Sequence, residues 1–193
     1  MNRSLLVALP VLTLAFAITA VASLVQSQVA PGALSQKALD RITHEVRHEL
    51  VMLPFYGVFD NLAYRVTPDG TVTLLGQVSR PSLKSDAEHA VKRIEGVEKV
   101  VNEIEVLPTS INDDQIRRAA YRAIYGNDTL GPYQLRAVPP IHVIVKNGNV
   151  TLEGVVARQM DKQIAGVQAN SVSGVFSVTN NLQVEEQSDD KKK

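Results

Sequence analysis

The sequence contains no cysteine. A disulfide framework and a cysteine-based metal site are therefore both excluded. The 20 Lys and Arg residues are balanced by 20 Asp and Glu residues, so the chain as a whole has no net charge that would attract nucleic acid or an anionic membrane. Binding to a charged partner would therefore need a local patch.

The motifs of several enzyme classes are also missing. No Ser/His/Asp arrangement, phosphate-binding P-loop or dinucleotide fingerprint occurs in the 193 residues. Gly148 and Gly154 bracket a short β-type run, and we interpret them as marking a turn and the end of a strand. His89 and His142 stand alone, which favours structural or exposed histidines. We expect no catalytic residue, no cofactor and no bound metal.

One motif does resemble a catalytic site. Residues 44–48 read HEVRH, which matches the zinc-protease pattern HExxH. On a helix, His44 and His48 project away from the apolar stripe that includes Val46. Val51 and Pro54 stand where the extended pattern requires glycine and a third histidine. A zinc protease is therefore only a remote third hypothesis.

The N-terminal segment is apolar and almost uncharged. Arg3 precedes a run without charges over residues 5–22, which ends in Ala-Val-Ala. This pattern predicts a signal peptide over residues 1–22, but the run is also close to the roughly 20 residues of a membrane anchor. Both interpretations place the rest of the chain outside the cytoplasm. Residues 23–34 look like a linker.

Two stretches of the chain, residues 66–106 and 145–184, repeat each other. From Gly70 on Gly148 to Val106 on Val184 the alignment runs without a gap, and Val72 and Leu74 fall on Val150 and Leu152. Six glycines also pair between the copies, where turns and helix caps are expected: Gly70, Gly76, Gly96, Gly148, Gly154 and Gly174. The repeat predicts two similar domains, residues 35–107 and 111–185, joined by residues 108–110 and followed by a disordered tail at 186–193.

Each copy has the same predicted order of elements. Ser35 is placed to cap a first helix that ends before Pro54, and Asn112 with Gln115 is placed to cap its counterpart. A hairpin, a second helix and a last strand follow. Because the crossover makes the last strand parallel to the hairpin's second strand, the fold class is α+β. Each αββαβ module then has a three-stranded mixed sheet with two helices on one face.

The connection over residues 51–59 carries no charge. Such a run can insert at a membrane interface or meet a partner. The alternative, which we favour, is that Phe55, Tyr56 and Phe59 cover the small core or join the two domains.

Four basic residues occupy equivalent places at the start of the second helix of each copy. They are Arg80 and Lys84 in the first copy and Arg158 and Lys162 in the second. Because a cation gains nothing from the dipole at a helix N-terminus, their retention points to contact with phosphate headgroups or acidic sugars. Inheritance from the duplication is the alternative.

The repeat resembles the BON domain. The second copy carries the pattern on Ile141, Val143, Val145, Asn147, Gly148, Val150, Leu152, Gly154, Gly174, Val175, Val178 and Asn180, and the first on Val66, Gly70, Val72, Leu74, Gly76, Gly96, Val97, Val100 and Asn102. The first copy departs in having Pro-Asp-Gly at the turn in place of Asn-Gly.

The resemblance implies a non-enzymatic module that binds phospholipid membranes or envelope components and protects the envelope under osmotic stress. An exported tandem pair is similar to periplasmic members of the family. The family supplies no ligand residues to carry over. A protein-interaction adaptor in an envelope assembly remains the alternative, and no nucleic-acid partner is expected.

Overall fold

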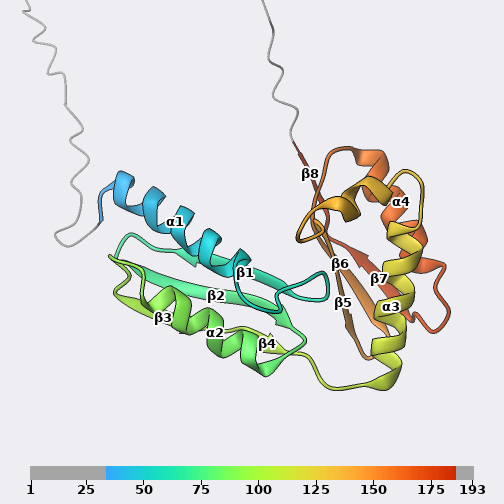
Figure 1. Ribbon diagram of the computed structural model, residues 1–193, viewed down its shortest axis with the longest axis horizontal. Coiled ribbons are helices and arrows are strands. Elements are labelled where there is room, and N and C mark those ends of the chain that lie inside the picture. The colour runs from blue at the N-terminus through green and yellow to red at the C-terminus, as the bar shows by residue number, and fades with distance from the viewer. Residues whose placement is uncertain (1–33, 186–193) are drawn as a thin grey trace, which may run out of the picture. The chain divides into compact units, whose positions relative to one another are not determined.

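The computed structural model describes residues 34–185 (Figure 1). These residues belong to one compact unit, Gly32–Lys193. The expected signal or anchor, almost all of the linker and the expected tail lie outside the described residues. Among the residues described, no helix combines the length and apolar character that a membrane crossing requires.

Two modules follow each other along the chain. The first contains α1 (Gln36–Val51), β1 (Asn61–Val66), β2 (Thr71–Val78), α2 (Pro81–Lys92), β3 (Lys99–Asn102) and β4 (Glu105–Val106). The second contains α3 (Ile111–Tyr125), the 3-10 helix η1 (Gly131–Leu135), β5 (Ile141–Lys146), β6 (Asn149–Val156), α4 (Gln159–Asn170), β7 (Ser177–Asn180) and β8 (Gln183–Val184). The predicted α+β class and the αββαβ order are confirmed, with η1 as an addition.

The third strand of each sheet is broken into two short pieces. β2 pairs antiparallel with β1 and parallel with both β3 and β4. The break follows Asn102, whose Oδ1 accepts the Ile104 N–H at 3.2 Å while its Nδ2 donates to the Lys84 carbonyl at 2.8 Å. Asn180 makes the same two bonds in the second module, at 3.3 and 2.7 Å. The mixed sheet is therefore as predicted, except that an asparagine interrupts its last strand.

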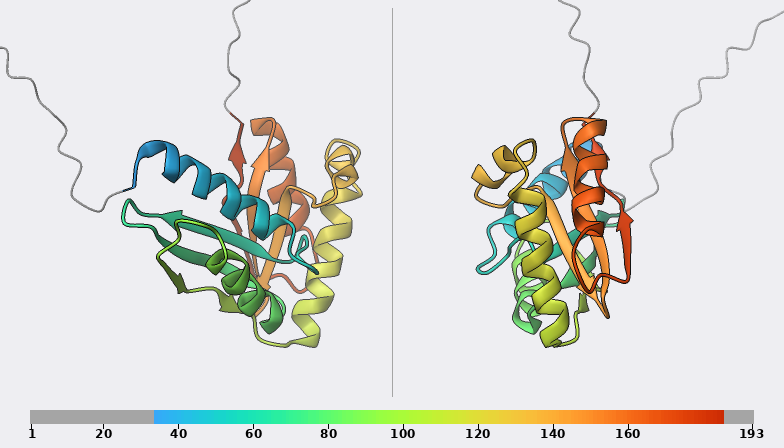
Figure 2. Two further views of the ribbon diagram at one scale, coloured as in Figure 1. Left: turned by 60° about the vertical axis from the view of Figure 1, so that its left-hand side comes forward. Right: turned by 90° about the vertical axis from the view of Figure 1, so that its right-hand side faces the viewer.

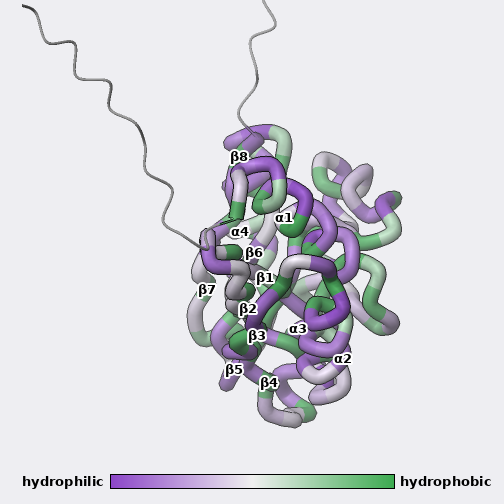
Figure 3. Tube along the Cα trace, turned by 90° about the vertical axis from the view of Figure 1, so that its left-hand side faces the viewer, coloured by the Kyte–Doolittle hydropathy of each residue, from purple (hydrophilic) through white to green (hydrophobic). Residues whose placement is uncertain are grey.

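Both helices of each module pack on one face of its sheet. Val72 and Leu74 point to the same side of β2 because side chains alternate along a strand. They share a buried cluster with Ile42 of α1 and Leu83 of α2, and burying each such side chain contributes about 1.5–3 kcal/mol. Figure 3 shows hydrophobic and hydrophilic residues following each other along the described helices and strands. In the second module α3 and α4 likewise lie side by side (Figure 2).

The first helix of each module begins at a serine. The Ser35 hydroxyl accepts the Ala38 N–H at 3.3 Å, as predicted. The prediction of Asn112 as a cap is wrong, because Ser110 caps α3 by accepting the Asp113 N–H at 3.2 Å. The short serine side chain reaches this N–H from just outside the helix, whereas Asn112 already lies within it.

The six paired glycines all have positive φ. The most demanding are Gly76 (φ +109°) and Gly154 (φ +120°), which lie within β2 and β6 and not at their ends. A Cβ atom would stand 2.1 Å from the Asn61 carbonyl oxygen at Gly76 and 1.9 Å from that of Pro140 at Gly154. The earlier placement of Gly154 at the end of a strand is therefore wrong, and the close approach of the neighbouring backbone explains the glycine.

Candidate functional site at the junction of the modules

The connection between α1 and β1 contacts the second module through its second half. The Val143 N–H of β5 donates to the Val58 carbonyl at 2.8 Å. The Phe59 ring meets Tyr121 edge-on, with centroids 6.1 Å apart. Val58 and Phe59 both pack against the core of the second module. This part of the uncharged run therefore joins the two modules.

Asp60 anchors the end of the connection. Its side chain is buried, and one carboxylate oxygen accepts both the backbone N–H (2.7 Å) and the hydroxyl (2.8 Å) of Ser79. The other oxygen accepts the Gly57 N–H at 3.2 Å. Hydrogen bonds to an ionised acceptor are about twice as strong as neutral ones, so Asp60 ties the connection to the start of α2.

The first half of the connection projects into solvent. Val51, Met52 and Phe55 are 47%, 67% and 71% exposed. Phe55 also has φ +68°, a conformation that costs a bulky residue roughly 1–3 kcal/mol. The Arg80 guanidinium lies over its ring, 4.9 Å from the centroid. We call Val51, Met52 and Phe55 the apolar tip; it carries a cation at its base.

The remaining predicted contact residues do not gather at this tip. Tyr56 turns away and stacks on His142 with centroids 5.7 Å apart. The Arg158 guanidinium donates to the buried Asp161 carboxylate at 2.9 and 3.2 Å. Burial raises the pKa of Asp161, but the bonds from Arg158 and from the Tyr133 hydroxyl outweigh this and lower it overall. The charge of Arg158 is thus balanced, whereas no ion pair is found for Arg80 within residues 34–185.

Lys84 lies on α2 of the first module and Lys162 on α4 of the second. The backbone carbonyls of Lys84 and Lys162 hold Asn102 and Asn180, which fixes both positions on their helices. Neither ammonium group forms an ion pair with another described residue. The four cations therefore occupy equivalent positions in the sequence, but Arg80 and Arg158 have different neighbours in the structure.

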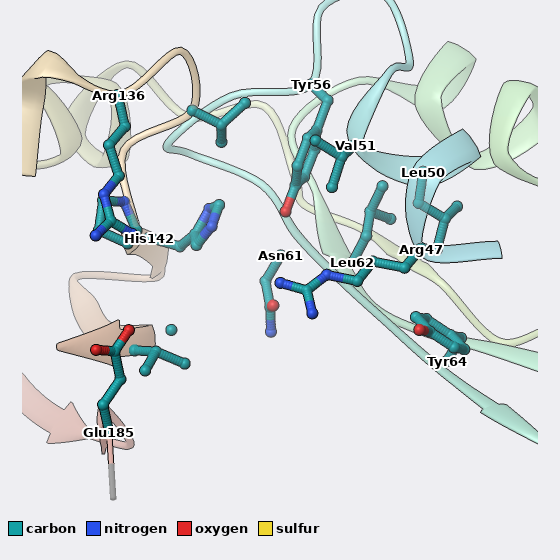
Figure 4. A pocket seen from close by; sticks show the side chains of 14 residues that line it. Arg47, Leu50, Val51, Tyr56, Asn61, Leu62, Tyr64, Arg136, His142 and Glu185 are labelled. Atoms are coloured by element: carbon teal, nitrogen blue, oxygen red, sulfur yellow. The ribbon is translucent and has the colours of Figure 1, made fainter. Parts of the chain in front are cut away.

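A cleft of about 630 Å³ is lined by residues of both modules. Arg47, Tyr56 and Asn61 enter it from the first module, while Arg136 and His142 line it from the second (Figure 4). Much of the remaining wall is apolar, and this wall includes Leu50, Val51, Leu62, Val138, Pro140 and Val155. We call this hollow the junction cleft.

Sequence reasoning missed most of the junction cleft. Arg47 and Arg136 lie 89 positions apart in the chain and in different modules, so no spacing brings them together. His142 stands alone in the sequence. The alternation of residues along β5 does not show that Tyr56 of the first module stacks on this histidine. The uncharged run at residues 51–59 was the one available signal.

The histidines of the HEVRH motif lie on the solvent-facing side of α1. His44 and His48 are exposed on α1. In the part of the chain that is described, no group of three or more His, Cys, Asp or Glu residues is arranged to hold a metal ion. The helix displays these histidines opposite to its buried residues Ile42, Val46 and Leu50.

His142 makes the junction sensitive to pH. Burial lowers the pKa of its ring below the ordinary value of 6.5, and this outweighs the opposing effects of the Gly57 and Asp60 backbone and the carboxylates of Asp60 and Glu153. The unfolded chain therefore takes up this proton at a higher pH than the folded chain does. Stability is full above pH 6.5 and is lost as the pH falls toward the folded-state pKa.

We accordingly expect the free energy of unfolding to decline between pH 7.5 and pH 5, with part of the decline due to His142. His142→Phe keeps an aromatic ring against Tyr56 and should reduce that decline. Urea unfolding followed by circular dichroism at several pH values measures it. Equal slopes for the variant and the wild type would show that His142 is not responsible.

The comparison with protein families finds the BON domain twice. The matches cover residues 39–108 and 112–186, together well over half of the chain.

The chain is also 31% identical over 113 residues to the outer membrane lipoprotein DolP of Haemophilus influenzae. This match covers 58% of each chain, so the chain spans little more than half the length of that relative. Among solved structures, the C-terminal domain of CdsD, a structural protein of the type III secretion system of Chlamydia trachomatis, matches at 13% identity. It covers 79% of this chain and 100% of that domain, with a TM-score of 0.29. So low a score carries no argument about function.

Proposed function

Because the chain belongs to the BON domain family, with two modules in tandem, we propose that it is an exported, non-enzymatic envelope protein that binds phospholipid membrane or another envelope component. In this proposal it supports the integrity of the envelope under osmotic stress. It acts in the periplasm, either free or tethered to the inner membrane by its N-terminal segment. The similarity to a protein named as an outer membrane lipoprotein supports an envelope location.

The apolar tip is the observation that carries the lipid proposal. Three exposed apolar side chains at the end of α1 and in the connection that follows, with Arg80 over the Phe55 ring, combine the two features that interfacial binding uses. The apolar groups enter the boundary of headgroups and acyl chains, and the cation attracts anionic lipid. The strained backbone of Phe55 also fits a functional position, since strain of this kind gathers at binding sites.

Fluorescence of a single tryptophan tests this insertion. The sequence has no tryptophan, so Phe55→Trp introduces the only one. We expect its emission to shift to the blue when vesicles containing phosphatidylglycerol are added at low salt. Vesicle sedimentation of Phe55→Ser should show binding weakened at least about tenfold, because burying an aromatic ring in the membrane contributes about 1.5–3 kcal/mol.

Phe176 supplies the matched control, since it is 85% exposed and lies on the second module, outside the tip. Phe176→Ser should bind vesicles like the wild type. Equal losses in the two variants would mean that any exposed phenylalanine contributes, and no binding to anionic or neutral vesicles by the wild type would refute the lipid proposal.

A second candidate function is that of a protein-interaction adaptor. Met160 and Val167 are exposed seven residues apart on α4, two turns along one helix face. An exposed apolar stripe of this kind is a common docking surface for a protein. Crosslinking in cells followed by purification would favour the adaptor if one protein were recovered without lipid dependence and Met160→Lys abolished its recovery.

A further inference from the structure

The junction cleft has the properties of a small-molecule site. Its volume of about 630 Å³ falls within the usual range of 300–1,000 Å³ for such sites. It lies between two modules, where ligand sites commonly occur, and its wall is shared between apolar and polar residues. Neither Phe55 nor Arg80 lines it, although Val51 of the apolar tip does.

Two arginines give the cleft a preference for anions. Arg47 comes from α1 and Arg136 from the segment that follows η1. Neither takes part in an ion pair within 4 Å among residues 34–185. Glu185 is the one acidic residue in the described lining, so two cations face one carboxylate.

Neutral polar groups lie between the arginines. Burial raises the pKa of Tyr56 to about 12, so its hydroxyl stays protonated and can donate a hydrogen bond. Figure 4 shows the polar ends of Tyr56, Asn61 and Arg47 directed into the same space. His142, nine-tenths buried in the same lining, has an Nδ1 atom without a hydrogen-bond partner within the described chain. A buried polar atom of this kind is rare enough in folded proteins to need an explanation.

The apolar part of the wall runs beside these groups. Leu50 and Val51 end α1, Leu62 lies on β1, and Val155 on β6 faces them from the second module. An apolar ligand bound here would remove both its own surface and the apolar wall from contact with water. Each methylene group that is buried contributes about 0.8 kcal/mol to binding. The cleft therefore combines a cationic and hydrogen-bonding part with an apolar part.

We propose that the junction cleft binds one molecule of a single-chain anionic amphiphile, with its acidic head at Arg47, Asn61 and Arg136 and its alkyl chain along Leu50, Leu62 and Val155. The head is a carboxylate or a phosphate, as in a fatty acid or a lysophospholipid. A cleft of this volume accepts one alkyl chain and not a whole two-chain phospholipid. The inference goes beyond docking on a bilayer, because here the lipid leaves the bilayer and enters the protein.

Isothermal titration tests the site with three probes that share a twelve-carbon chain. These are dodecanoate, dodecyl phosphate and dodecyltrimethylammonium, each kept below its micelle concentration. We expect at least one of the two anions to bind with a stoichiometry of one, at least about tenfold more tightly than the cation. Binding of dodecanoate alone identifies a fatty acid site, and binding of dodecyl phosphate alone identifies a phosphate headgroup. Equal binding of the cation, or several molecules per chain, overturns the proposal.

Variants separate the site from general stickiness. Arg47→Gln and Arg136→Gln should each weaken binding of the anion about tenfold, since each removes one charge-assisted contact. Arg65→Gln is the matched control, because Arg65 is exposed on β1 and does not line the cleft. Circular dichroism melts establish that all three variants are folded. Anion binding that Arg47→Gln and Arg136→Gln leave unchanged refutes the assignment.

The same experiments distinguish this site from the membrane-binding tip. Phe55→Ser should lose vesicle binding and keep the one-to-one binding of the anionic probe. Arg136→Gln should do the reverse. If the probe binds and vesicles do not, the cleft stands and the bilayer proposal fails; if vesicles bind and the probe does not, the cleft proposal fails alone.

Discussion

Gly154→Ala is expected to lower the free energy of unfolding of the second module by about 4 kcal/mol, a large part of the stability of a small domain. Two effects add. The φ of +120° is one that L residues rarely adopt, and the new Cβ atom would stand 1.9 Å from the Pro140 carbonyl oxygen and 3.0 Å from its carbon. Both atoms belong to the backbone, so no side chain can rotate out of the way.

The neighbouring backbone has little freedom to move. Ile141, the residue after Pro140, pairs directly with Gly154 in the β5–β6 ladder. Relieving the clash would therefore separate the edge strand β5 from the central strand β6, and these strands also carry the buried Val143 and Leu152. Overpacking alone costs about 1–3 kcal/mol, and backbone strain of this kind adds a similar amount.

Gly148→Ala is the matched control. Gly148 also has positive φ, at +76°, but a Cβ atom there would meet nothing closer than 3.5 Å. Only the cost of the left-handed conformation remains, about 1–2 kcal/mol. Urea unfolding followed by circular dichroism compares the two variants. Equal losses would show that conformation, and not the close approach of Pro140, decides the need for glycine at position 154.

The fold was predictable because its constraints recur locally. Glycines at equivalent places in two copies indicated turns, and alternating valines indicated strands. Asn102 and Asn180 were part of the family pattern, and the structure gives their reason, since each holds its second helix and ends its strand. The turns, helices and strands of each module depend on residues close together in the chain, so the sequence was enough to predict them.

The junction could not be derived in the same way. The stacking of Tyr56 on His142 and the contact of Arg80 with Phe55 join residues with no periodic relation. Arg117 illustrates the same limit. It is buried on α3, where it donates to the Val145 carbonyl at 2.8 Å. A charged residue on a helix predicts exposure, and only the tertiary contacts overrule that prediction.

The uncharged connection is partly exposed and partly buried between the modules. The sequence offered two alternatives for residues 51–59, exposure or burial between the domains. The structure divides the run, with Phe55 exposed and Phe59 packed against the second module. A connection that is fixed at one end can hold an apolar tip in a defined place, which lowers the entropy lost on binding.

Asp60 tests how much that fixed end matters. Asp60→Ala removes the acceptor of the Gly57 N–H and of both donors of Ser79. Each buried donor left without a partner costs about 1–3 kcal/mol, so we expect the first module to lose about 3 kcal/mol. Asp128→Ala, an exposed aspartate outside the junction, should change stability by less than about 0.5 kcal/mol. Urea unfolding measures both, and a loss for Asp60→Ala no larger than that for Asp128→Ala would contradict the anchoring role.

A second readout separates anchoring from simple loss of stability. In the Phe55→Trp background and under conditions where the protein remains folded, Asp60→Ala should weaken vesicle binding, because the released connection must be ordered again at the membrane. Asp60→Asn keeps one oxygen acceptor, so its vesicle binding should lie between that of the parent protein and that of Asp60→Ala. If vesicle binding is unchanged in folded Asp60→Ala, the tip binds as a flexible apolar segment. Asp60 then serves the packing of the modules alone, and the strained geometry at Phe55 has no part in membrane binding.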